Sequence, residues 1–215
     1  MSIFNLQFPD KSGSTLRCDR LSLSGEGIRV MKSQSAETIT FTKEFTRQEP
    51  IPDAGIKRAL ELMKSGRLHR YNTAAGEISE VSLLEKEYAD YVGARYCLGL
   101  SSCGSSIYVA LKSVGVVSGD KILCNVFTLA PVPGAIENAG AVPVFVEINE
   151  DYLTDLEDLE NKASQSGAKY FLLSHMRGHI VDMDRVSEIC CRLGISLIED
   201  CAHTVGCRWG AKYTG

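Results

Sequence analysis

The sequence predicts an α/β domain built on an open, mostly parallel sheet. From residue 96 onward, short apolar runs alternate with amphipathic segments. Apolar runs of this length are typical of parallel strands that are buried on both faces. The amphipathic segments between them have the spacing of crossover helices that pack on such a sheet. The chain has 215 residues, of which 44% are hydrophobic and 23% charged. This length and composition predict one globular domain.

Two helices are expected before the sheet. The segment 53–64 is amphipathic and is followed by Gly66, and in residues 77–93 apolar side chains recur every three to four positions until Gly93 ends the pattern. Residues 1–48 are rich in Ser, Thr, Lys and Arg and keep no helical or strand period. We therefore expect residues 1–48 to be a loosely held polar extension and residues 49–215 to form the domain.

The strands and crossover helices of the domain follow in chain order. The strands are expected at the five apolar runs, which are residues 96–102, 121–127, 142–148, 169–175 and 195–200. Two of the crossover helices show their buried face directly: Ile107, Ala110, Leu111 and Val114 for the first, and Met183, Val186, Cys190 and Leu193 for the second. In an open sheet of this kind, ligands bind beyond the carboxyl ends of the strands.

The net charge and the cysteine pattern limit the classes of partner and the compartment that we expect for this chain. The formal net charge is −4, so the chain has no broad positive field for nucleic acid or for an anionic membrane surface. No apolar run approaches the roughly 18 residues of a membrane span, and the N-terminus resembles no secretion signal. The eight cysteines form no C-x-x-C pair. We expect a cytoplasmic protein with free thiols whose partners are small molecules.

The turn after the first apolar run is a candidate anion site. Residues 101–106 read Ser-Ser-Cys-Gly-Ser-Ser and lead directly into a predicted helix. Backbone N–H groups at such a helix start converge on one point and can hold a phosphate without a lysine. The alternative interpretation is that the serines only cap the helix.

The last apolar run ends in two carboxylates, Glu199 and Asp200. A carboxylate at the tip of a dry parallel strand faces the ligand crevice and requires a cationic partner, which is the interpretation we give to Asp200. The alternative for Asp200 is an ordinary N-cap of a following helix. Glu199 points to the other side of the strand, where a structural role is expected.

A zinc site is a third candidate. His175 and His179 are four residues apart, and Cys201 and His203 follow the last strand. Two imidazoles at this spacing on one helical face can bind zinc, although Gly178 and the preceding strand interrupt a helix here. A zinc-dependent hydrolase that uses these four residues is therefore an alternative function.

From residue 50 to 215 the sequence resembles the N-terminal half of the DegT/DnrJ/StrS sugar aminotransferases, which are pyridoxal-phosphate enzymes of fold type I. Four segments carry the resemblance in the family's order: SSCGSSIYVAL, GDKILCNVFTLAPVPGAIENAGAVPVFVEI, SHMRGHIVDMD and LIEDCAHTVG. The resemblance implies a mostly parallel large domain that is truncated before its last strands and small domain.

The resemblance also implies roles for individual residues. Cys103, Gly104 and Ser105 would bind the phosphate of pyridoxal 5'-phosphate, and Asp200 would pair with the pyridinium nitrogen. His203 would lie near the phenolic oxygen of the cofactor. Leu129 stands where the family has an aromatic residue stacked on the ring, with Phe127 two positions earlier.

The implied reaction moves an amino group from an amino acid, expected to be glutamate, to a keto sugar linked to a nucleotide, in a homodimer. The lysine that the family uses for covalent attachment of the cofactor aligns beyond Gly215, and Lys212 aligns with a surface turn. The chain by itself is therefore expected to be inactive. The alternative is a non-catalytic relative or a fragment that serves binding or assembly.

Overall fold

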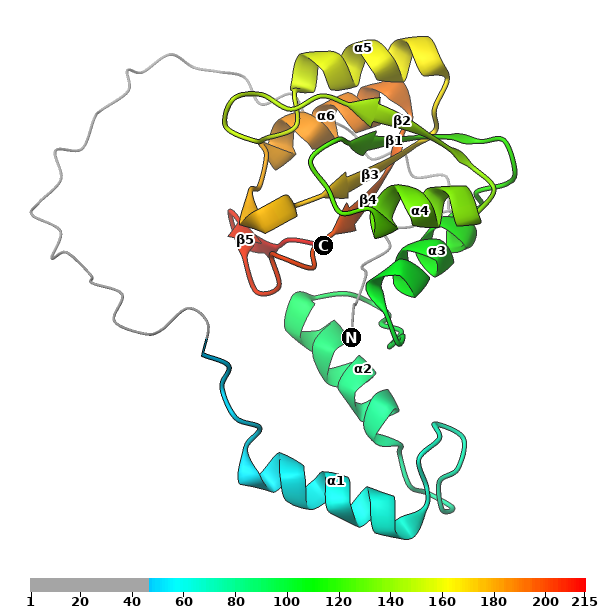
Figure 1. Ribbon diagram of the computed structural model, residues 1–215, viewed down its shortest axis with the longest axis vertical. Helices are drawn as coiled ribbons and strands as arrows, with labels where there is room; N and C mark the ends of the chain where they lie inside the picture. The colour runs from blue at the N-terminus through cyan, green and yellow to red at the C-terminus, as the bar shows by residue number, and fades with distance from the viewer. Residues whose placement is uncertain (1–46) are drawn as a thin grey trace, which may run out of the picture. The chain divides into compact units, whose positions relative to one another are not determined.

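The computed structural model describes residues 47–215, which belong to two units, one ending at Leu68 and one beginning at His69. The second unit contains a four-stranded parallel sheet with strand order β2-β1-β3-β4 (Figure 1). The strands are β1 (Lys121–Asn125), β2 (Val142–Val146), β3 (Tyr170–Ser174) and β4 (Ser196–Asp200). The prediction of an α/β fold with a mostly parallel sheet is confirmed.

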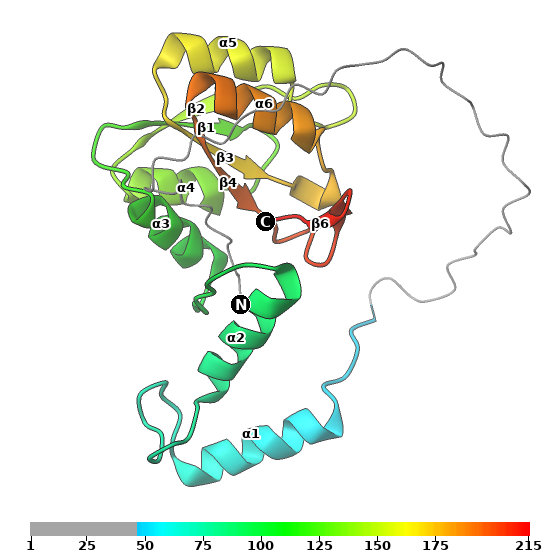
Figure 2. The ribbon, with the colours of Figure 1, turned by 180° about the vertical axis from the view of Figure 1, so that it is seen from behind.

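Helices cover both faces of the sheet, and the strand residues alternate between two hydrophobic clusters. α3 (Cys103–Ser113) and α4 (Pro131–Asn138) pack on one face, while α5 (Leu156–Ser166) and α6 (Met183–Leu193) pack on the other (Figures 1 and 2). Along β3, Leu172 faces α3 and α4, whereas Phe171 and Leu173 face α5 and α6. Because successive strand side chains point to opposite faces, a strand in this position must be apolar throughout.

The first predicted strand, residues 96–102, is wrong as a strand. Within the described residues, this segment forms no ladder with the sheet and contains only an isolated bridge residue at Leu100. Tyr96 is 74% exposed and Leu98 47%. An apolar run becomes a strand only beside a neighbour that accepts its backbone hydrogen bonds, and here the Gly99 N–H donates at 2.7 Å to the Glu85 carboxylate instead.

The helix predicted over residues 77–93 is confirmed as α2 (Glu80–Val92). Ser79 caps its N-terminus by accepting a hydrogen bond from the Ser82 N–H. Gly93 ends the helix with φ of 76°, a left-handed conformation that glycine adopts without a steric penalty.

Two short antiparallel strands near the end of the chain were not expected from the sequence. They are β5 (Arg208–Trp209) and β6 (Lys212–Tyr213). A single turn of 3-10 helix, η1 (Met176–Gly178), follows β3.

In the first unit, the predicted helix over residues 53–64 is confirmed as α1 (Asp53–Ser65), which ends at Gly66. Its apolar side chains Ile56 and Leu60 are about half exposed. The polar extension predicted for residues 1–48 lies, except for its last two residues, outside the described part of the chain. Of the helices in residues 47–215, none has the length and apolarity that crossing a membrane requires.

The buried β3 side chains should dominate stability. Replacing Phe171, which is fully buried, by alanine should lower the free energy of unfolding by about 3–5 kcal/mol because it leaves a cavity under α5 and α6. The matched control is Phe145→Ala on β2, where the ring is 43% exposed and the loss should be about 1 kcal/mol. Urea denaturation measures both, and equal losses would contradict this account of the core.

Candidate functional site

Three neighbouring strands each end in a polar residue whose side chain is buried. Asn125 ends β1, Ser174 ends β3 and Asp200 ends β4, and none of the three is more than 6% exposed. Because the three strands are parallel neighbours, these residues lie along one edge of the sheet. They are the positions where a dry sheet first admits polar groups.

Hydrogen bonds connect the three residues. The Ser174 N–H donates to Asn125 Oδ1 at 2.9 Å, and Asn125 Nδ2 donates to the Ser174 carbonyl at 3.1 Å. The Ser174 hydroxyl in turn donates to Asp200 Oδ2 at 2.9 Å. We refer to Asn125, Ser174 and Asp200 as the strand-end row.

Among the residues that the structure describes, the Asp200 carboxylate has only uncharged donors. Besides the Ser174 hydroxyl, it accepts from the Ala202 N–H at 3.2 Å. Within residues 47–215, no cationic side chain pairs with it. A buried carboxylate without a cationic protein partner is a site that attracts a cationic ligand group.

The turn before α3 ends in the N-cap of that helix, which is Ser102. The Ser102 side chain accepts a hydrogen bond from the Ser105 N–H at 3.1 Å, and the two hydroxyl oxygens are 2.9 Å apart. Capping, the alternative interpretation of this motif, is thus what Ser102 does. A Cβ atom placed on Gly104 would meet no atom within 4 Å, so the space beside this backbone is open. An anion approaching the turn would reach the Gly104 amide and would compete with Ser102 for the Ser105 amide.

Cys103 joins this turn to the strand-end row. Its Sγ lies 3.8 Å from Asp200 Oδ1, although the two residues are 97 positions apart in the chain. The N-terminus of α3 therefore lies beside the carboxyl end of β4. The structure brings the two main sequence-predicted features, the turn and Asp200, into one place.

His203 lies on the loop that follows β4, and its side chain is exposed. Its Nδ1 accepts a hydrogen bond from the Arg177 N–H at 3.1 Å. Arg177 has a φ of 58°, an unusual left-handed conformation for a side chain of this size. Since Nδ1 is an acceptor, the neutral imidazole carries its proton on Nε2, which remains available as a donor.

Leu129 and Phe127 lie in the loop between β1 and α4. Leu129 is 51% exposed. The ring of Phe127 packs against Tyr152 and His179, with centroids 5.3 Å and 6.3 Å away. Phe127 thus already has ring partners within the chain, whereas Leu129 has an open side.

Of the four residues predicted as zinc ligands, the structure brings together only His175 and Cys201, with Glu199 beside them. His175, Glu199 and Cys201 place their potential ligand atoms within 4.8 Å of one another, while His179 packs against Phe127 and His203 bonds to Arg177. His175 Nε2 lies 2.9 Å from Glu199, and its Nδ1, on the other side of the ring, has no hydrogen-bond partner within residues 47–215.

A further contact of Glu199 favours a structural role for this group. Glu199 also accepts from the Gly215 N–H at 3.3 Å, as expected for a carboxylate that braces a loop. Burial, with a smaller contribution from Glu199, raises the pKa of the Cys201 thiol to about 12.

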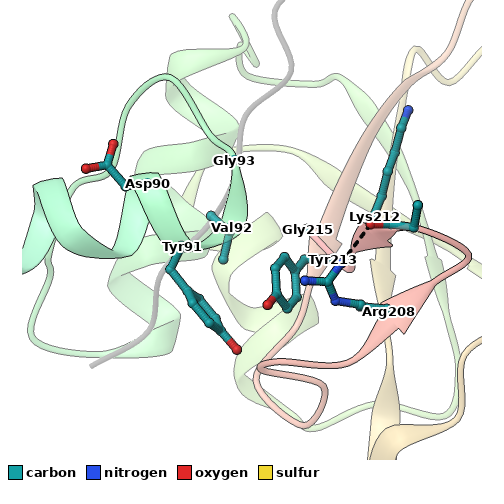
Figure 3. Close-up of a pocket in the computed structure, with 9 residues that line it drawn as sticks. Asp90, Tyr91, Val92, Gly93, Arg208, Lys212, Tyr213 and Gly215 are labelled. Atoms are coloured by element: carbon teal, nitrogen blue, oxygen red, sulfur yellow. Dashed lines mark hydrogen bonds between the residues drawn. The ribbon is translucent and has the colours of Figure 1, made fainter.

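A pocket of about 470 Å³ lies between the end of α2 and the β5–β6 hairpin (Figure 3). In Figure 3, the ring of Tyr213 lies between Tyr91 and Arg208, with the guanidinium carbon of Arg208 3.8 Å from the ring centroid. The hydrogen bond from Tyr91, followed by that from Arg208, lowers the pKa of the Tyr213 phenol. The residues that line this pocket include no member of the strand-end row and none of the candidate cofactor or zinc ligands predicted from the sequence.

Sequence reasoning missed Asn125 and Ser174. Ser174 is the next-to-last residue of the run 169–175, so the signal that singled out Asp200, applied to every run, would have found it. Asn125 lies inside the run 121–127, where Val126 and Phe127 follow it, and only the structure shows that the strand ends there.

The fold is that of known aminotransferases. The solved structure of 3-amino-5-hydroxybenzoic acid synthase matches 80% of this chain with a TM-score of 0.72 and 28% identity. DesV from S. venezuelae matches 76% of the chain with a TM-score of 0.65 and 30% identity.

The chain belongs to the DegT/DnrJ/EryC1/StrS aminotransferase family, whose sequence profile matches residues 53–215. It is similar to a dTDP-3-amino-3,4,6-trideoxy-alpha-D-glucose transaminase from Micromonospora megalomicea subsp. nigra, with 38% identity over 63% of this chain. It is also similar to an L-glutamine:2-deoxy-scyllo-inosose aminotransferase from Streptomyces kanamyceticus, with 30% identity over 77% of this chain. The chain spans 36% and 39% of those two proteins, and 44% and 41% of the two solved structures.

Thiol reactivity should follow burial. Cys190 and Cys191 are adjacent on α6, but Cys190 is buried and Cys191 is exposed. Burial raises the pKa of Cys190 to about 11, so at pH 8 only about one part in a thousand is thiolate. We expect iodoacetamide to label Cys191 on the native protein and to label Cys190 and Cys201 only after unfolding. Peptide mass spectrometry measures this, and equal labelling of Cys190 and Cys191 would be inconsistent with the described packing.

Proposed function

We propose that this chain forms the pyridoxal 5'-phosphate-binding part of an aminotransferase that moves an amino group from glutamate to a keto sugar linked to a nucleotide. One observation carries the proposal: within residues 47–215, the buried Asp200 carboxylate has only neutral donors, and it lies beside the N-terminus of α3. The family membership of residues 53–215 supports the reaction class.

The residues present suit a group with a phosphate at one end and a basic ring nitrogen at the other. Cys103, Gly104 and Ser105 would hold the phosphate, because the helix start offers backbone amides and the side of Gly104 is open. Asp200 would hold the protonated ring nitrogen, because its charge has no cationic partner within residues 47–215. When bound, the cofactor supplies an electron sink for the negative charge that develops as the substrate loses its α-proton.

His203 and Leu129 complete the proposed contacts. The Nε2 proton of His203 would be donated to the phenolic oxygen, since Nδ1 already accepts from Arg177. Leu129 would pack on the ring with its exposed aliphatic side chain in place of an aromatic residue. Phe127 is less suited to this role because Tyr152 and His179 already contact its ring.

The substrate class rests on the relatives. The Micromonospora protein is described as a transaminase for a dTDP-linked amino sugar, which supports a nucleotide-linked keto sugar as amino acceptor. The proposal includes a cytoplasmic homodimer, in line with the family resemblance of four segments of the sequence.

Pyridoxamine 5'-phosphate tests the proposal, since it binds without a covalent bond to the protein. The chain should bind it saturably, with inorganic phosphate as a competitor. Asp200→Asn should weaken binding at least ~10-fold, because a neutral amide no longer favours the protonated ring. Isothermal titration calorimetry measures both affinities.

The control is Asp155→Asn, the same substitution at the N-cap of α5, where asparagine also caps well. It should leave the affinity unchanged. The absence of saturable binding, or equal affinities for Asp200→Asn and the control, would refute the proposed role of Asp200.

A further inference from the structure

Every polar atom of the Asn125 amide in the strand-end row has a partner within the chain. Asn125 donates from Nδ2 to the carbonyls of Phe127 and Ser174, at 2.9 Å and 3.1 Å, and accepts from the Ser174 N–H. Both hydrogens and the oxygen of its amide therefore have partners. A buried amide with three hydrogen bonds of this kind fixes its neighbours in one arrangement.

The Asn125 side chain forms hydrogen bonds to β3 beyond the last backbone pair between β1 and β3. The pairing of β1 with β3 ends at Cys124 and Leu172, so Ser174 lies beyond the last backbone pair on that side. On the other side, Ser174 still pairs with Asp200 in the β3–β4 register. The Asn125 side chain thus closes the open side of Ser174 and fixes the end of β3 between its two neighbours.

The Ser174 hydroxyl then orients the carboxylate. A carboxylate only accepts hydrogen bonds, so the proton of the Ser174 hydroxyl points to Asp200 Oδ2. Oδ1 accepts from the Ala202 N–H and from the more distant Cys103 thiol. Each carboxylate oxygen has two acceptor positions. Counting the bonds within residues 47–215, the acceptor position that remains is on Oδ2, beside the Ser174 hydroxyl.

We infer that Ser174, fixed by Asn125, is a positioning residue that holds Asp200 so that one acceptor position on Oδ2 stays open for a cationic ring nitrogen. This inference rests on the proposed function for the identity of the ligand. Its structural part, the control of the Asp200 carboxylate by the Ser174 hydroxyl, concerns the unliganded chain alone.

The first measurement therefore uses no ligand. In ¹³C-labelled chain at pH 7, the Asp200 carboxylate carbon should shift in Ser174→Ala and keep its wild-type resonance in Ser174→Thr, which retains the hydroxyl. The control is Thr214→Val, which should leave the Asp200 resonance unchanged. It removes another buried hydroxyl, whose partners are the Thr204 hydroxyl and carbonyl. An unchanged Asp200 resonance in Ser174→Ala would overturn the inference whatever the chain binds.

The second measurement adds pyridoxamine 5'-phosphate labelled with ¹⁵N in the ring. Ser174→Ala should bind it ~10-fold more weakly and shift the ring nitrogen resonance toward neutral pyridine, because an interaction with a charged group has been lost. Ser174→Thr should restore both properties. A purely structural role for Ser174 would not change the ring nitrogen resonance.

A double-mutant cycle separates the two levels of the argument. If Ser174 acts through Asp200, then Ser174→Ala should cause no further loss of affinity in the Asp200→Asn background. Additive losses would overturn the inference while leaving the proposed function intact. A wild-type chain that does not bind the probe would overturn the proposed function, and the ligand-free resonance would still decide whether Ser174 controls the Asp200 carboxylate.

Discussion

The burial of both faces of the parallel sheet is the constraint on which the rest of the structure depends. Every residue in the body of β1 and β3 meets helices on one side or the other, so polar side chains are admitted only where the strands end. Asn125, Ser174 and Asp200 occupy these ends. The site is therefore a consequence of the core, because the same packing that excludes water from the strands brings the three polar residues into contact.

The sequence predicted the elements that local pattern determines. Four of the five apolar runs are strands, since an apolar run between two amphipathic helices can be buried only in a sheet between them. The run at residues 96–102 also begins with apolar residues but forms no strand ladder within the described residues, and the Glu85 carboxylate accepts from its Gly99 N–H instead. A strand forms only beside a neighbouring strand that can be distant in the chain, and the sequence of the run does not show whether such a neighbour is present.

The candidate site divides in the same way. Asp200 could be recognised because a carboxylate at the tip of an apolar run is conspicuous in one sequence. The contact of Cys103 with Asp200 and the pairing of Ser174 with Asn125 depend on strand order and register. Four strands can be ordered in many ways, and the sequence alone does not state that β1 and β4 lie on either side of β3.

The donors around Asp200 show why its environment differs from that of the neighbouring carboxylate. Glu199 lies 2.9 Å from a ring nitrogen of the buried His175 and also braces Gly215, so its acceptor capacity serves the protein. Asp200 receives a hydroxyl and a backbone N–H, which orient a carboxylate without neutralising it. An arginine or lysine in their place would satisfy the charge and leave nothing for a ligand. Neutral donors keep the charge available, which is why we propose the cofactor contact at Asp200, whereas Glu199 braces the loop at Gly215.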